Sequence, residues 1–480
     1  MTSDTLPPIE SVSGGSHGVQ AGYEQMLALA ERYERQAGDF VEMAGLGARI
    51  MANGDLLESA ILSPISFGDA ELQVLDATTG TNGLTVRAIG IEADALGVRA
   101  VVAAFKASDS LSRHATEMLD NALGKLLFVG TVAALPALLA AGGISYAYYS
   151  TLSPEEQEAL KAQLADNLGQ LLHDHPELAQ HLINGGGGLL ESLVPGLGLL
   201  NPGDGPIDQA TTNDAARLLA LLLGNSTDFD VNHLDGIDPS MNQSHTPRSL
   251  EDLMLSLNDT NLLDQTEPDH HGAIQIQRIV ENGQERFIVY IPGTDDLGPI
   301  PQDGEHARDM ETNYQLIGGM DSAYGQGIQQ AMLDAGLEGK DVMLVGHSQG
   351  GMVSTSLAAD PDFSRHFNVQ HVVTAGAPTA QVPDLPSGTS AIHLENRGDA
   401  VPLLDGEDNP DQPNRTTVKF DEGSSDIADN HAIKHYANGA AAADASTNGS
   451  IQDQIRQMQE DGYLGSGTVE DVSTYQITRG

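Results

Sequence analysis

The pattern of hydrophobic positions divides the chain into a helical first half and a second half in which strands alternate with helices. Apolar side chains recur at helical spacing across residues 17–48 and again across about 84–121. A Gly-Thr-Asn-Gly turn lies at 80–83 within the looser segment between them. We therefore expect an antiparallel pair of helices, with further helices at 154–183 and 209–224.

Beyond about residue 246, short β-branched runs alternate with helical patterns. Asn282-Gly283 separates two apolar runs, which is the strongest short signal for a β-hairpin. Strands that alternate with helices predict an α/β domain whose sheet is parallel in its centre. The expected strands are 272–280, 286–293, 341–346, 371–377, 390–396 and 416–420, and the expected helices are 249–264, 322–336, one from 348 and one from about 430.

These patterns suggest four parts along the chain. Residues 1–122 form a helical N-terminal module, and 123–245 form an apolar, glycine-rich helical segment with a linker. Residues 246–446 form the α/β domain, and 447–480 form a polar C-terminal tail. The chain length of 480 residues fits a protein of more than one domain.

The segment 126–154 carries no charged residue, and its length satisfies the usual criterion for a membrane span. Pro136 lies in its middle, and Gly142-Gly143 interrupts its later part. Two interpretations stay open at this point. The segment is either a buried helical hairpin or a stretch that contacts a membrane through residues 126–149.

Charge and cysteine content narrow the classes of function. The chain has 22 basic and 68 acidic residues, for a net charge of −46. Nucleic-acid binding depends on Lys and Arg contacts to phosphate, so we expect no nucleic-acid partner. The absence of cysteine excludes disulfides and thiol catalysis. The N-terminus lacks the pattern of a signal peptide, so we expect a secreted or cell-surface protein without a cleaved signal, or alternatively a cytoplasmic one.

The sequence GHSQG at residues 346–350 directly follows the apolar strand 341–346 and precedes a run that is compatible with a helix. A serine on a strained turn from a strand to a helix is the arrangement of the nucleophile elbow. The flanking glycines leave room for close backbone approach, and the helix N-terminus favours a developing negative charge. We therefore predict that Ser348 is a nucleophile.

A nucleophile elbow requires an acid and then a histidine later in the chain. Asp399 follows the strand 390–396 and is the candidate acid, with Glu395 and Asp405 as rivals. His431 follows the last expected strand and is the candidate base, with His435 as the alternative. His347 is expected to line the site rather than to act as the base, because it directly precedes Ser348 in the sequence.

The predicted site also requires an oxyanion hole, and we expect it to contain no metal. We predict that the backbone N–H groups of Gln349 and Thr294 bind the oxyanion. The acidic loop 404–414 does not match the spacing of a calcium-binding loop, and we expect it to be a solvated turn. No cofactor and no metal are expected.

The motifs together resemble α/β-hydrolases of the class 3 lipase type. IPGT (291–294) is similar to that family's oxyanion strand end, GHSQGG (346–351) to its elbow, TAGAP (374–378) to the segment that follows it, and ENRGDAVPLLDG (395–406) to its acid motif. His431 with Tyr436 is similar to an H-x-x-x-x-Y pattern of actinobacterial hydrolases. Ile291-Pro292 departs from the family's usual Phe-Arg. The N-terminal half is similar to helical modules of actinobacterial type VII-secreted proteins, although the chain has no tryptophan for their Trp-x-Gly turn.

The resemblance implies an α/β-hydrolase fold and a serine ester hydrolase of the lipase or esterase type. Its substrate would be a small-molecule or lipidic ester. Two alternatives stay open: an acyltransferase or thioesterase on the same triad, and a membrane-active or interaction protein that carries the hydrolase as its effector. The acyl chain, the alcohol portion, the export route and the oligomeric state do not follow from the sequence.

Overall fold

A computed structural model describes residues 6–51, 63–79, 83–92, 226–237, 245–266, 270–296, 306–424 and 427–480, with a few shorter pieces between 53 and 220. Contacts divide the chain into two compact units, one formed by residues 19–115 and the other by 1–18 together with 116–480. The expected helices at 154–183, most of 209–224 and the segment 126–149 lie outside the described residues. Among the helices that are described, none has the length and apolar character needed to cross a bilayer.

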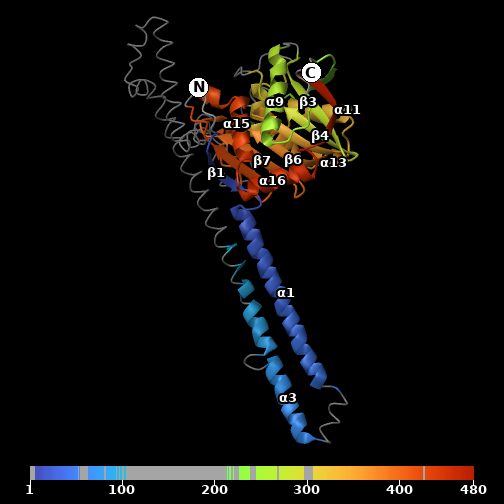
Figure 1. Cartoon of the computed structure of the whole chain (residues 1–480), viewed down its shortest axis with the longest axis vertical. Helices are drawn as coiled ribbons and strands as arrows, with labels where there is room; N and C mark the ends of the chain where they lie inside the picture. The colour runs from blue at the N-terminus through green and yellow to red at the C-terminus, as the bar shows by residue number, and fades with distance from the viewer. Residues whose placement is uncertain are drawn as a thin grey trace, which may run out of the picture. The chain divides into compact units, whose positions relative to one another are not determined.

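The unit 19–115 contains two long helices that pack side by side (Figure 1). Helix α1 (Val19–Met51) confirms the expected helix, but α3 (Pro64–Thr79) lies where the sequence predicted a looser segment. Pro64 is suited to the first turn of a helix, where a missing N–H costs nothing. Gly47 of α1 faces Thr78 of α3 so closely that a Cβ would overlap the threonine methyl group. Small residues thus let the two backbones approach.

The other unit is built on a sheet that has nine strands within the described part of the chain (Figure 1). Strands β4 to β8 are parallel, while β1 and the group β3, β9 and β2 are antiparallel at the two edges. In their order across the sheet, the strands are β1 (Ile9–Gly14), β8 (Arg415–Phe420), β7 (Ser390–Asn396), β6 (Asn368–Ala375), β5 (Asp341–His347), β4 (Gln284–Ile291), β3 (Ala273–Glu281), β9 (Thr468–Arg479) and β2 (Phe229–Leu234).

Helices cover both faces of this sheet, and the central strand shows how the sequence achieves this. In β5, Met343 and Val345 join one buried cluster, whereas Val342 and Leu344 join the other. Successive side chains of a strand point to opposite faces, so an unbroken apolar run serves both. The first cluster includes α9 (Leu250–Thr266), α15 (Ile433–Asp444) and α16 (Gly449–Glu460), and the second includes α11 (Ala323–Asp334), α12 (Gln349–Ala359) and α13 (Phe363–His366). This is the mainly parallel, two-sided architecture of the α/β-hydrolase fold.

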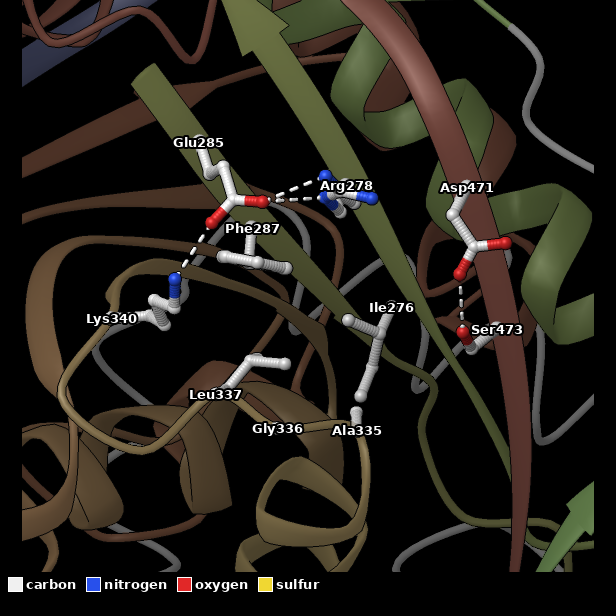
Figure 2. A pocket seen from close by; sticks show the side chains of 10 residues that line it. All are labelled: Ile276, Arg278, Glu285, Phe287, Ala335, Gly336, Leu337, Lys340, Asp471 and Ser473. Atoms are coloured by element: carbon white, nitrogen blue, oxygen red, sulfur yellow. Dashed lines mark hydrogen bonds and ion pairs between the residues drawn. The ribbon is translucent and has the colours of Figure 1, made fainter. Parts of the chain in front are cut away.

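The expectation of a polar C-terminal tail at 447–480 is wrong. Helix α16 packs on the sheet, and β9 pairs with both β3 and β2. Figure 2 shows Asp471 and Ser473 of β9 opposite Ile276 and Arg278 of β3, around a cavity of about 280 Å³. The segment is polar overall because its outward positions are polar. The alternate positions Tyr475 and Ile477 are buried, which is the pattern of a strand with one covered face.

The domain boundaries at the N-terminal side also need correction. Strand β1 lies within the expected helical module 1–122, yet it pairs with β8. Strand β2 lies within the expected linker 123–245, yet it pairs with β9. Both segments add antiparallel edges to the sheet. The α/β unit therefore includes β1 and β2 in addition to strands and helices of the expected range 246–446.

Candidate active site

Ser348 occupies a sharp turn between β5 and α12. Its backbone has φ of 54° and ψ of −123°, a conformation that non-glycine residues rarely adopt. Its N–H donates to the carbonyl of Ala375 at the end of β6, at 2.9 Å. A Cβ on Gly346 would overlap the Gly350 carbonyl, and a Cβ on Gly350 would overlap the Ile291 carbonyl. The two glycines are thus required for the elbow to fit between the strands, as the sequence predicted.

Asp399 and His431 form a close pair. Asp399 follows β7, and His431 lies between the short helix α14 (Ile427–Asn430) and α15. The Nδ1 atom of His431 is 2.6 Å from Asp399 Oδ2, and the N–H of Val401 donates to Oδ1 at 2.9 Å. The carboxylate side chain is fully buried, while the imidazole is 23% exposed. Because a carboxylate accepts, Nδ1 carries the proton and Nε2 is left with a lone pair.

Tyr436 from α15 reaches the same carboxylate. Its hydroxyl donates to Asp399 Oδ2 at 2.6 Å and accepts the Asn396 N–H at 3.3 Å. Burial, together with the negative charge of Asp399, raises the pKa of Tyr436 well above its ordinary value, so the phenol keeps its proton. The sequence pattern had singled out Tyr436, but not this contact.

His347 touches the base without replacing it. Its Nε2 is 2.8 Å from the His431 carbonyl oxygen, and the two rings lie 4.5 Å apart. Burial lowers the pKa of His347 well below its ordinary value, so the ring is neutral. A carbonyl only accepts, so the single ring proton of His347 sits on Nε2. His347 therefore holds the backbone of His431, in agreement with its expected place in the wall of the site.

Ser348 and the Asp399–His431 pair both lie at the carboxyl edge of the sheet. Gly376 directly follows Ala375, which accepts the Ser348 N–H, and its φ is +61°. A Cβ built on Gly376 would lie 3.0 Å from Asp399 Oδ2. Ser348 is itself 9% exposed. One short stretch after β6 thus contacts both halves of the predicted triad.

The alternative residues have other partners. His435 lies 3.3 Å from Glu422 and 3.0 Å from Asp429, so its ring is not paired with Asp399. Within the described residues, no group of three histidine or acidic side chains is arranged to hold a metal ion.

The rival acids Glu395 and Asp405 belong to a separate buried network. Glu395 accepts from Asn409 at 2.7 Å, and Asp405 accepts the Ala380 N–H at 2.7 Å. Burial raises the pKa of each carboxyl group to about 7. Asp405 is only 2% exposed, so the expectation that 404–414 is simply a solvated turn is wrong at this residue. The loop docks because a buried backbone N–H needs an acceptor.

The two expected oxyanion donors lie on adjoining segments. Gln349 is the first residue of α12, and its side chain donates to the Asp309 carbonyl at 2.7 Å. Thr294 follows β4, and its hydroxyl accepts from Asn313 Nδ2 at 3.0 Å. A Cβ on Gly293 would lie 2.8 Å from the Ser348 Cβ, so this loop passes directly over the serine. Asn313 comes from α10 (Met310–Ile317), a helix that the sequence analysis missed.

The sequence also did not predict a contact that holds the loop of His431 in place. The Asn396 side chain donates to both the backbone and the side-chain oxygen of Asn430, each at 3.1 Å. Asn430 immediately precedes His431, so the end of β7 fixes the loop that carries the histidine. The signal was present in the N-x-x-D spacing that joins Asn396 to Asp399, but the partner across 34 residues could not be read from it.

Comparison with known proteins supports this part of the fold. Residues 321–448 match the profile of a protein family described as PGAP1-like alpha/beta domain, which is of the α/β-hydrolase type. This part of the chain has an α/β-hydrolase-type fold. The matched range contains Ser348, Asp399 and His431. Searches of curated proteins and of solved structures found no match.

Proposed function

We propose that the protein is a serine carboxylic-ester hydrolase with Ser348 as its nucleophile. Two observations carry the proposal: a strained elbow serine, and a buried carboxylate–imidazole pair at the same edge of the sheet. A nucleophile near a base that a third group orients is the general signature of covalent serine catalysis. The hydrolase-type family match is consistent with this chemistry.

The reaction follows from the assigned proton positions. His431 Nε2 takes the Ser348 proton as Oγ attacks the ester carbonyl, and Asp399 stabilises the imidazolium that forms. The N–H groups of Gln349 and Thr294 hold the oxyanion. His431 then protonates the departing alcohol, which leaves an acyl group on Ser348. Water attacks this acyl-enzyme by the same route and releases the acid.

The similarity of the four motifs to class 3 lipases favours an acyl ester substrate, including lipidic esters. An acyltransferase or thioesterase would use the same groups and would differ only in what attacks or leaves the acyl-enzyme. Product analysis with an added alcohol separates transfer from hydrolysis. A membrane role for residues 126–149 remains a separate prediction, since that segment lies outside the described residues.

The test is steady-state hydrolysis of nitrophenyl esters of increasing acyl length. We expect turnover by the full chain, a preferred chain length, and loss of turnover in Ser348→Ala and His431→Ala. Ser354→Ala is a matched control, because this buried serine on α12 bonds to the Gly350 carbonyl and has no assigned catalytic role. Turnover that persists in folded Ser348→Ala would refute the proposal.

A further inference from the structure

A second serine–histidine–aspartate arrangement lies away from Ser348. His371 of β6 and Ser390 of β7 are direct neighbours across two parallel strands. His371 Nδ1 is 2.8 Å from Ser390 Oγ, and His371 Nε2 is 2.8 Å from Asp461 Oδ2. Asp461 caps the C-terminus of α16, which packs against β7 (Figure 1).

This cluster belongs to the opposite part of the sheet from the first site. His371 lies four residues before Ala375, which contacts the elbow, so about 13 Å of strand separates them. Ser390 opens β7, whereas Asp399 follows its other end. None of the contacts of Ser348 or Asp399 described above involves this cluster.

The proton positions can be assigned from the partners. The hydrogen bond from His371 lowers the pKa of Asp461, which is therefore an acceptor. His371 Nε2 consequently carries the ring proton, and Nδ1 is left with a lone pair. The Ser390 hydroxyl must then donate to Nδ1. An aspartate thus orients an imidazole whose free nitrogen faces a serine, which is the arrangement of an activated nucleophile.

All three residues line one cavity of about 450 Å³. This volume falls in the range of small-molecule sites. The cavity wall is mostly amide, hydroxyl and carboxylate groups, from Ser16, Gln370, Asn414, Asp453, Gln454 and Gln457 among others. A ligand that carries hydroxyl groups can exchange hydrogen bonds with these polar side chains.

We propose that Ser390 is a second activated serine, which accepts the acyl group of small, hydroxyl-bearing esters that enter this cavity. Ser390 Oγ attacks the ester carbonyl while its proton moves to His371 Nδ1. The ester C–O bond then breaks, and the same proton passes to the departing alcohol. The products are an ester on Ser390 and one free alcohol. The side chain of His371 is only 3% exposed, so the base is shielded from water.

The experiment uses diisopropyl fluorophosphate on the full chain, with peptide mapping by mass spectrometry. The serine oxygen displaces fluoride from phosphorus, and His371 takes the proton. We expect an adduct at Ser390 in Ser348→Ala, formed at least tenfold more slowly when His371→Gln is added. His366→Gln is the control, because this histidine pairs with Glu338 and has no serine partner.

The outcomes separate this proposal from the hydrolase proposal. Absence of an adduct at Ser390 overturns the second site, whatever happens at Ser348. An adduct at Ser390 that forms equally fast in His371→Gln also overturns it, because the base would then have no role. Circular dichroism of each variant establishes that the labelled protein is folded. If the wild-type chain is labelled at Ser390 but not at Ser348, the result counts against the proposed hydrolase and leaves the second site supported.

Discussion

Replacing Tyr436 by Phe removes one hydroxyl and tests whether the hydrogen bond from this hydroxyl to Asp399 contributes to stability and to catalysis. The hydroxyl gives Asp399 Oδ2 a 2.6 Å hydrogen bond, and the same oxygen accepts from His431 at 2.6 Å. The phenyl ring remains, so the packing of α15 against the sheet is largely kept. The variant therefore removes the hydrogen bond to a fully buried carboxylate, together with the longer one that the hydroxyl accepts from the Asn396 N–H.

The magnitude follows from that burial. A hydrogen bond to a charged group contributes about 1.5–3 kcal/mol, so we expect the free energy of unfolding to fall by about that amount. With one donor fewer, the carboxylate is held less firmly and orients the imidazole of His431 less well. We therefore expect kcat for ester hydrolysis to fall by up to about tenfold, with little change in KM.

The assay is steady-state hydrolysis of a nitrophenyl ester, which gives kcat and KM separately, together with urea unfolding. Tyr290→Phe is a matched control, since this buried tyrosine donates to a neutral partner, Gln277, at 3.2 Å. The control should lose stability without a loss of kcat. An unchanged kcat in Tyr436→Phe would refute the idea that the tyrosine acts through Asp399, even if stability fell.

Three further predictions concern the same domain. We expect the free energy of unfolding of Ser348→Gly to exceed that of Ser348→Ala by about 1–3 kcal/mol, because glycine adopts the positive φ without strain. Equal urea midpoints of the two variants would contradict this. His435→Ala should keep most ester turnover while His431→Ala loses it, and the reverse result in a kinetic assay would exchange their roles. Burial raises the pKa of Glu395 from about 4.5 to about 7, so its folded form keeps a proton that the unfolded chain has released between these values. Stability should therefore fall as pH rises through this window, and Glu395→Gln should gain on the wild type between pH 5 and 8 in urea melts; a constant difference would count against the buried carboxyl.

The central sheet could be predicted because its strands carry strong local signals. The run 341–346 is apolar throughout, and the Asn282-Gly283 turn has both residues at positive φ, as its hairpin requires. The elbow, the acid and the base were predicted from spacing alone, and the structure pairs Asp399 with His431. These features depend on short stretches whose local conformation and neighbours along the chain are enough to define them.

The parts that the sequence did not predict depend on pairing between distant segments. β1 has only six residues without a regular alternation of polar and apolar positions, and its partner β8 lies about 400 residues later, so its sequence did not indicate a strand. The same holds for β9, whose buried face shows only once β2 and β3 flank it. The contacts of Tyr436 with Asp399 and of His347 with His431 likewise depend on the closed fold.

The most direct test of the central claim is pre-steady-state hydrolysis of a nitrophenyl ester, with the acid-quenched protein digested and its peptides weighed. The account predicts a burst of nitrophenol equal to the enzyme concentration and an acyl adduct on the peptide that contains Ser348. Both should vanish in Ser348→Ala. Steady turnover with no adduct at Ser348, or a burst that survives in Ser348→Ala, would contradict the account.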